Sequence, residues 1–273
     1  MSVSDPHRFS NQLDGITTQR LIERLESRAK DDIFTKLFNQ YVSKLDLPES
    51  ALVLEVGCGT GVIARALVNR QNFLRKVVGV DQSPAFIEAA IRFAIEESVE
   101  EKVDFVVGDA HDLNIEDECF DVLIAHTLIS HVTDPMKVLK EVVRLVRKGG
   151  CIVLFDGDYA SLTYAFPDHE FGLQMDHALA TTTFNNPLIM RDIPRILPKI
   201  GLEIKETLAN VISEIGTASY FNSFAETYAP LAAKSGLVAK NNVNDWLAKQ
   251  KIAMNDGTFF ASCNYYTYIA QRI

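Results

Sequence analysis

The chain has 273 residues and a formal net charge of −9, since 27 lysines and arginines stand against 36 aspartates and glutamates. Hydrophobic residues make up 47% of it and charged residues 23%, which is typical of a globular protein with one large domain or a core with an appended region. The acidic balance argues against a nucleic-acid partner, because such proteins usually carry a basic patch.

Membrane and metal proteins are disfavoured on similar grounds. No stretch approaches the ~20 apolar residues of a membrane span. Residues 1–6 lack the basic start and apolar core of a signal peptide, so we expect a cytoplasmic protein. The four cysteines lie far apart without a CxxC pair, which predicts neither a metal site nor a disulfide framework. Cys119 and Cys151 are expected to be buried thiols.

The first part of the chain has the periodicity of helices. Apolar residues such as Leu21, Ile22 and Leu25 recur at spacings of three and four, which predicts helical structure from about residue 16 to 45. A proline-containing break at 47–50 ends this region.

Strands and helices then alternate. The pairs Ser83-Pro84 and Asp134-Pro135 each supply an N-cap and a proline at the first helical position, and Gly149-Gly150 is expected to stop the second of these helices. Continuous apolar strands between amphipathic helices indicate a parallel sheet covered on both faces. The predicted strands are 52–56, 77–81, 103–107, 120–125 and 151–155, and the helices between them are 62–69, 84–97 and 135–146.

The regularity weakens after Asp158. We expect an irregular aromatic segment over 159–190, a strand over 201–215, helices over 217–255 and a last strand over 259–270. The predicted fold class is therefore α/β, a doubly wound, mostly parallel, seven-stranded Rossmann-like sheet with N-terminal helices and a mainly helical cap. The expected divisions are an N-terminal helical lid over 1–48, the cofactor-binding core over 49–158, a cap over 159–258 with a core helix and strand near 191–215, and a final core strand over 259–273.

A glycine-rich turn follows the first predicted strand. Gly57, Gly59 and Gly61 alternate in a loop whose backbone a ligand can approach closely, and the next helix would point its free N–H groups at that ligand. A dinucleotide site would have a glycine where this chain has Val62. Asp81, at the end of the second strand, could bind the ribose hydroxyls of a dinucleotide or of another nucleoside cofactor, so the glycine spacing distinguishes these cofactors better than Asp81 does.

Four motifs in order resemble those of class I S-adenosylmethionine-dependent methyltransferases, in the small-molecule branch that includes quinone and natural-product methyltransferases. The motifs cover residues 50 to 156, with weaker similarity at the last strand. They read Glu55-Val-Gly57-Cys-Gly59-Thr-Gly61, Val80-Asp81, Gly108-Asp109-Ala110 and Phe120-Asp121-Val122…His131-Val132…Asp134-Pro135…Arg147-Lys-Gly149-Gly150.

The resemblance implies S-adenosylmethionine as the cofactor, S-adenosylhomocysteine as the product, and a role for each matching residue. Glu55 and the backbone of Gly57, Cys58, Gly59 and Gly61 would hold the methionine end. Asp81 would take the ribose hydroxyls, and Gln82 would flank the adenine. Asp109 would face the adenine amino group beside the Ala110 N–H, and His126 and Thr127 would line the sulfonium side. His131 would belong to the cofactor shell or be structural.

The acceptor is less defined by the sequence. Asp158 and Tyr159 follow the fifth strand, where the acceptor is expected, and the aromatic residues after the core suit an apolar acceptor, the cap's own core or a homodimer face. The N-terminal arginines Arg20, Arg24 and Arg28 are expected above the cofactor or on a solvated face. The candidate general bases are His126, which we favour, and His131, Asp156, Asp158, His169 and His177.

We therefore predict an S-adenosylmethionine-dependent methyltransferase acting on the O, N or C atom of a small, largely apolar or aromatic metabolite, plausibly in specialised metabolism. The alternatives are a quinone-biosynthesis C-methyltransferase, an NAD(P)-dependent oxidoreductase and a non-catalytic S-adenosylmethionine-binding module. The oxidoreductase is disfavoured by Val62 and by the lack of a Tyr-x-x-x-Lys pair.

Overall fold

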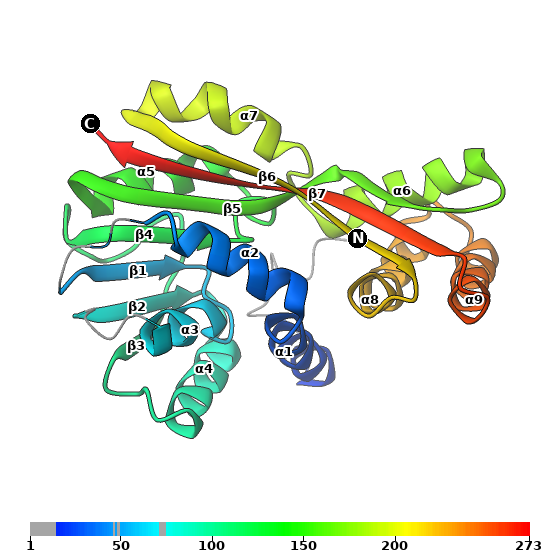
Figure 1. The fold of residues 1–273 in the computed structure, drawn as a ribbon, viewed down its shortest axis with the longest axis horizontal. Coiled ribbons are helices and arrows are strands. Elements are labelled where there is room, and N and C mark those ends of the chain that lie inside the picture. Colours follow the sequence, from blue (N-terminus) through cyan, green and yellow to red (C-terminus); the bar gives the residue numbers. More distant parts are fainter. Residues whose placement is uncertain (1–14, 46, 48–49, 71–74) are drawn as a thin grey trace.

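The computed structural model describes residues 15–45, 47, 50–70 and 75–273, so the prediction made for residues 1–6 lies outside the described part. Its centre is a seven-stranded sheet with the order β3-β2-β1-β4-β5-β7-β6 (Figure 1). Neighbours from β3 to β5 pair in parallel, and β7 is antiparallel to both β5 and β6. The predicted fold class is confirmed. The strands are β1 Leu52–Val56, β2 Lys76–Asp81, β3 Val103–Val107, β4 Phe120–His126, β5 Val146–Tyr164, β6 Leu202–Gly216 and β7 Phe259–Arg272.

Helices cover both faces of the sheet. On one face, alternate strand residues such as Val53 and Val77 pack on α2 and α3; on the other, Leu54 and Leu123 pack on α5 and α7. None of the helices in the described ranges is long and apolar enough to cross a membrane. The helices are α1 Gly15–Ala29, α2 Asp32–Val42, α3 Val62–Arg70, α4 Pro84–Glu96, α5 Pro135–Leu145, α6 His169–Thr183, α7 Ile189–Ile196, α8 Tyr220–Ser235 and α9 Lys240–Asn255, with a 3₁₀ turn at Leu197–Ile200.

The predicted helix starts are confirmed in detail. The Ser83 hydroxyl accepts the Phe86 N–H at 3.4 Å, and the Asp134 carboxylate accepts the Lys137 N–H at 3.0 Å. The N-terminal helical region, in contrast, is interrupted. Asp31 accepts the Ile33 N–H at 2.9 Å and so starts a second helix, α2.

The predicted end of α5 is wrong. The helix ends at Leu145, before Gly149-Gly150, because Val146 is already extended (φ −83°, ψ 133°) and pairs with Phe120 of β4. Cys119 and Cys151, expected to be buried, are partly exposed.

The cap is also more regular than predicted. Instead of ending near residue 155, β5 continues to Tyr164, and its far part pairs with β7 at Thr163↔Ser262 and Tyr164↔Ala261. The segment predicted to be irregular therefore contains the end of a strand, the helix α6 and the start of α7. β5, β6 and β7 run together from the core to the cap helices α6, α8 and α9 (Figure 1).

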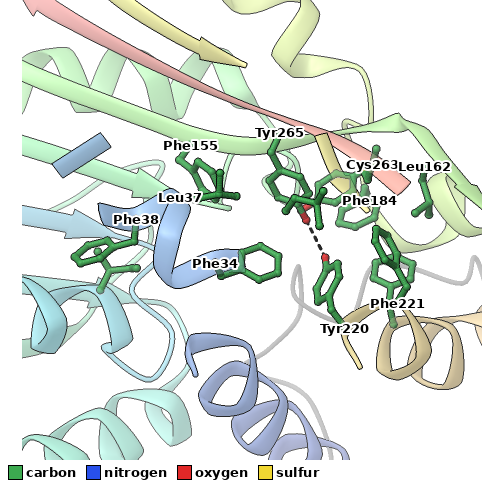
Figure 2. Close-up of a cluster of buried hydrophobic side chains, with 14 of the residues drawn as sticks. Phe34, Leu37, Phe38, Phe155, Leu162, Phe184, Tyr220, Phe221, Cys263 and Tyr265 are labelled. Atoms are coloured by element: carbon green, nitrogen blue, oxygen red, sulfur yellow. Dashed lines mark hydrogen bonds between the residues drawn. The ribbon is translucent and has the colours of Figure 1, made fainter. Parts of the chain in front are cut away.

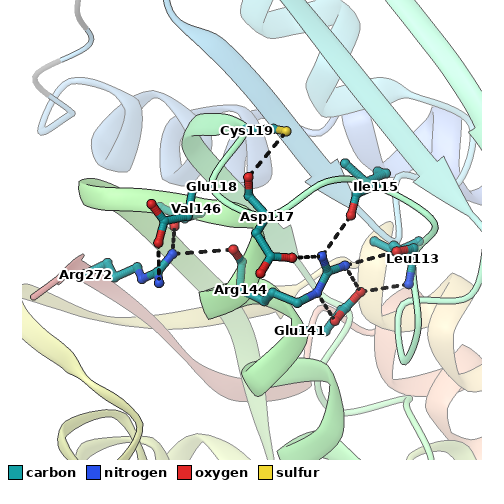
Figure 3. A network of polar contacts seen from close by, with 9 residues as sticks. All are labelled: Leu113, Ile115, Asp117, Glu118, Cys119, Glu141, Arg144, Val146 and Arg272. Carbon is teal, nitrogen blue, oxygen red and sulfur yellow. Dashed lines mark hydrogen bonds and ion pairs between the residues drawn. The ribbon is translucent and has the colours of Figure 1, made fainter.

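One arginine fixes the loop between β3 and β4. The Arg144 guanidinium donates to the carbonyls of Ile115 at 2.8 Å and Leu113 at 3.0 Å, and to Glu141 Oε2 at 2.8 Å (Figure 3). Glu141 Oε1 in turn accepts the Leu113 N–H at 2.8 Å. This network holds in place the loop that carries Asp109.

Candidate functional site

A cavity of about 570 Å³ lies at the carboxyl ends of β1, β2 and β4 and reaches under α1, α2 and α8. This is where a doubly wound sheet binds its ligands. Of the residues predicted to bind the cofactor, it is lined by Glu55, Gly57, Cys58, Gly59, Asp81, Gln82, Asp109, Ala110, His126, Thr127 and His131. These residues form what we call the glycine-loop half of the cavity.

The glycine turn has a conformation that other residues would strain. Gly57 has φ +71°, and a Cβ there would come within 2.5 Å of Leu128 Cδ1. Its N–H donates to the Val80 carbonyl at 2.8 Å, which ties the turn to β2. Without a Cβ, the turn presents its backbone to the cavity at this position.

Gly61 is not among the described residues that line the cavity. A Cβ on it would lie 2.4 Å from Phe105 Cζ, so this glycine permits close packing of the loop on β3. Its predicted cofactor contact stays a prediction.

Glu55 is a buried carboxylate, 2% exposed, at the end of β1. Its Oε2 accepts the Ala64 N–H in the first turn of α3 at 2.9 Å. Burial raises its pKa from 4.5 to about 8, and the neighbouring Asp81 charge adds to the rise. Ionised Glu55 would be stabilised by a cationic group in the cavity.

Asp81 joins the glycine turn to α4. Its Oδ2 accepts the Gly59 N–H at 2.9 Å, and its Oδ1 accepts the Ser83 N–H at 2.9 Å. Burial raises the pKa of Asp81, against these backbone hydrogen bonds. The carboxylate is thus held at the cavity wall by two different loops.

Asp109 is joined to the loop after β4 by a histidine that the sequence analysis missed. His111 Nδ1 lies 2.6 Å from Asp109 Oδ1, and His111 Nε2 accepts the Asp134 N–H at 3.3 Å. Since Nε2 is the acceptor, the neutral ring carries its proton on Nδ1 and donates it to Asp109. His111 therefore orients the carboxylate that borders the cavity.

His126 ends β4 and Thr127 follows it, and both line the cavity. Thr127 has φ +54°, which is unfavourable for a β-branched residue, and its hydroxyl accepts from Arg28 Nη2 at 3.0 Å. His126 Nδ1 lies 3.1 Å from the Tyr41 hydroxyl, and its ring lies 4.4 Å from that of Phe155. Burial, and then the Arg28 charge, hold the pKa of His126 well below 6.5, so the ring is neutral at neutral pH.

Two other candidate bases stabilise the loop after β4. Asp156 is 1% exposed; its carboxylate accepts the N–H of Ser130 at 3.0 Å and of Gly157 at 2.8 Å, and it is not among the described cavity-lining residues. His131 does line the cavity, with its ring 5.0 Å from Phe184.

Of the remaining candidates, three are not among the described residues that line the main cavity, namely Asp158, His169 and His177. Asp158 is paired with α7 instead, since both its oxygens accept from Arg191 Nε at 3.0 Å, and its predicted contact with the acceptor stays a prediction. His169 and His177 lie exposed on α6. Tyr159 does line the cavity, and its ring stacks on Phe184 at 3.4 Å.

The other half of the cavity is aromatic. Figure 2 shows rings from α2, β5, β7 and α8 gathered beside it, with the Tyr220 and Tyr265 hydroxyls hydrogen-bonded at 2.8 Å. The Phe34 ring lies 4.7 Å from that of Tyr220. We call this region the aromatic half; its cavity-lining rings are Phe34, Tyr159, Phe184, Tyr220, Phe224 and Tyr228.

Helix α1 closes the cavity. Glu26 Oε1 accepts from the Thr60 hydroxyl at 2.6 Å and from Arg65 Nη2 at 2.7 Å, which attaches the helix to α3 and the glycine turn. Arg24 and Arg28 of the same helix line the cavity. Arg20 is exposed.

Comparisons with known proteins agree with this geometry. Residues 54–154 match a family model described as a methyltransferase domain. The uncharacterized 37.1 kDa protein in transposon TN4556 of Streptomyces fradiae is 25% identical over 92% of this chain and 71% of its own length. The sterol 24-C-methyltransferase erg6 of Aspergillus fumigatus is 33% identical over 41% of this chain and 29% of its own length. Four further curated relatives are matched over 37% to 47% of their length, so the chain spans less than half of each.

The fold has similar solved structures. The crystal structure of the [4+2]-cyclase SpnF superimposes with a TM-score of 0.65 at 18% identity, over 100% of this chain and 98% of its own. Residues 54–154 therefore resemble a methyltransferase domain, and they run from β1 into β5, where the four motifs lie.

Proposed function

We propose that this chain binds S-adenosylmethionine in the glycine-loop half of the cavity and transfers its methyl group to a small, largely apolar or aromatic acceptor in the aromatic half. The observation that carries this proposal is that one cavity is lined by both halves. Donor and acceptor would thus be held against each other, and such alignment supplies about 7 kcal/mol or more towards a two-substrate reaction.

The residues of the glycine-loop half fit the proposed cofactor. Glu55, buried and hydrogen-bonded to the Ala64 N–H, is suited to the amino group of the methionine end. Asp81 and Asp109 offer carboxylate oxygens to a ribose and an adenine. The cofactor has no phosphates, and no lysine is found among the described lining residues. When bound, S-adenosylmethionine would supply an electrophilic methyl group.

The aromatic half would exclude water and hold the acceptor. Tyr159 and Phe184 form a stacked wall there, and we propose that Tyr159 contacts the acceptor. His126, at the junction of the halves, would present a neutral imidazole that accepts a proton from the acceptor. With Nε2 as the accepting atom, the Nδ1 proton would be donated to Tyr41.

The cofactor assignment can be tested by calorimetric titration with S-adenosylmethionine and, in parallel, with NADH. The expected result is binding of the first, weakened about 10-fold or more in Asp81→Asn, since a hydrogen bond to a charged group contributes about 1.5–3 kcal/mol. Asp104→Asn, an exposed acid of β3 that pairs with Lys76, is the matched control. Absence of heat, or undiminished binding by Asp81→Asn, would refute the assignment.

Turnover needs its own assay, because the similar structure named a [4+2]-cyclase shows that fold alone does not establish methyl transfer. We would incubate the enzyme with S-adenosylmethionine and a panel of phenols, indoles and quinones and measure S-adenosylhomocysteine. Binding without its formation would favour the non-catalytic module. The methyltransferase domain match already favours methyl transfer over the NAD(P)-dependent alternative.

A further inference from the structure

Two arginines of α1 line the cavity from the same side. Arg24 and Arg28 are four residues apart, so their side chains lie on one face of the helix. Arg24 Nη1 donates to the Ser223 hydroxyl at 2.9 Å, and Arg28 Nη2 donates to the Thr127 hydroxyl at 3.0 Å. Each guanidinium has five N–H groups, so much of its donor capacity is left for a ligand.

Neither arginine forms an ion pair at contact distance within the described part of the chain, although, against the effect of burial, the more distant Asp156 carboxylate helps to raise the pKa of Arg28. The ion pairs recorded there join α1 to the core through Glu26 and Arg65, and none involves Arg24 or Arg28. Like charges four residues apart destabilise a helix, and an anion between them would reverse that repulsion. Two cations that line a cavity without a directly paired carboxylate are therefore a recognition feature for an anion.

The rings around both arginines belong to the aromatic half, and Arg28 also reaches Thr127 at its border with the glycine-loop half. The Arg24 guanidinium carbon lies 4.9 Å from the ring centre of Tyr228 and 5.5 Å from that of Phe224, and the Arg28 carbon lies 4.6 Å from that of Phe34. Such contacts hold the guanidinium planes against the rings and leave their edges available for hydrogen bonds.

The glycine turn is covered by different residues of α1. A Cβ on Gly59 would lie 3.1 Å from Leu25 Cδ1, and Glu26 binds the Thr60 hydroxyl. Leu25 and Glu26 thus face the cofactor half, while Arg24 and Arg28 turn towards α2, β4 and α8. This division places the arginines beside the acceptor.

We propose that the acceptor is an organic acid, with an apolar or aromatic body held by the rings of the aromatic half and an anionic oxyacid group held by Arg24 and Arg28. This inference rests on the proposed function and specifies the substrate class of the same site. Planar, bidentate recognition of such a group is a property of guanidinium that a lysine would not reproduce.

The test compares near-isosteric acids and amides. Naphthoate against naphthamide and indoleacetate against indoleacetamide would be titrated into the protein saturated with S-adenosylhomocysteine, by calorimetry or ligand-observed NMR. We expect the acids to bind about 10- to 100-fold more tightly than the amides in the wild type, and this preference to be lost in the double variant Arg24→Gln/Arg28→Gln. Arg20→Gln, the same change at an exposed position of α1, should retain it.

Three results would overturn the inference. The first is equal or undetectable binding of acids and amides by wild-type protein that binds S-adenosylhomocysteine. The second is an acid preference that survives in the double variant. The third is a loss of S-adenosylhomocysteine affinity in that variant comparable to its loss of acid affinity, which would assign the arginines to the cofactor carboxylate. Failure of the wild type to bind S-adenosylhomocysteine would instead refute the proposed function. Unchanged circular dichroism and melting would show that the double variant is folded.

Discussion

Glu55→Gln should stabilise the ligand-free protein at high pH while weakening cofactor binding. Burial raises the Glu55 pKa from 4.5 to about 8, so between these values the folded chain holds a proton that the unfolded chain has released. The contribution of protonated Glu55 to the free energy of unfolding is therefore complete below pH 4.5 and is lost as the pH rises to about 8. From pH 6 to pH 8 the wild type should lose roughly 2 kcal/mol by this linkage, which the neutral glutamine avoids.

Thermal melting across this pH range measures the effect. For a chain of this size roughly 2 kcal/mol corresponds to about 4–8 °C, so the melting temperature of Glu55→Gln should gain that much on the wild type between pH 6 and pH 8. Glu116→Gln, at an exposed position, is the control and should follow the wild type. A gap between Glu55→Gln and the wild type that stays constant with pH would refute the argument.

The same carboxylate should make cofactor binding depend on pH. Near pH 7 most Glu55 side chains carry a proton, and an incoming ammonium group would favour the ionised form. Binding of S-adenosylmethionine should therefore release up to about one proton and tighten as the pH rises towards 8. Titration in two buffers of different ionisation enthalpy would detect this proton, and Glu55→Gln should abolish it.

Three further variants test individual contacts. Glu26→Gln removes the charged partner of Arg65 that attaches α1 to α3, and stopped-flow fluorescence should show S-adenosylmethionine dissociating roughly 10-fold faster; an unchanged rate would contradict closure by α1. Arg191→Met leaves the buried Asp158 carboxylate without its cation and should lower the free energy of unfolding in urea by about 1–3 kcal/mol. Cofactor binding should be unchanged, and weaker binding would instead indicate that this pair belongs to the site. Because the pKa of His126 lies well below 6.5, the pH profile of kcat should have no inflection near pH 6.5 that depends on this ring. An inflection there that disappears in His126→Asn would mean that the ring titrates in the complex.

The elements that could be predicted from the sequence are those with local signals. Ser83-Pro84 and Asp134-Pro135 start helices through contacts within three residues, and the glycine turn joins β1 to α3 through its own backbone. Hydrophobic strands of the parallel core were also recognisable, because their burial on both faces makes them continuously apolar. These features need no knowledge of distant partners.

The features that escaped prediction depend on partners far along the chain. β5 extends to Tyr164 because residues near 262 pair with it. His111 acquires its role from Asp134, 23 residues later, and Asp158 is paired with Arg191, 33 residues later. The role of Tyr41 was not predicted, because its position fits the apolar stripe of α2 and the helical periodicity does not show that its hydroxyl is hydrogen-bonded to His126. In each case the sequence shows which chemical group the side chain carries, but not which distant residue it contacts.

The long strand β5 has a consequence for how the cavity opens. Its residues hold the loop after β4 through Asp156, the α7 region through Asp158 and the aromatic wall through Tyr159, so the loop that carries Thr127 and His131 and the wall of the aromatic half are attached to one continuous strand. Helix α1 is held differently, by the small cluster of Leu21 and Ile22 with α4 and by side-chain hydrogen bonds to α3, β4 and α8. Breaking these few contacts costs less than separating paired strands, and we therefore expect ligands to enter by movement of α1.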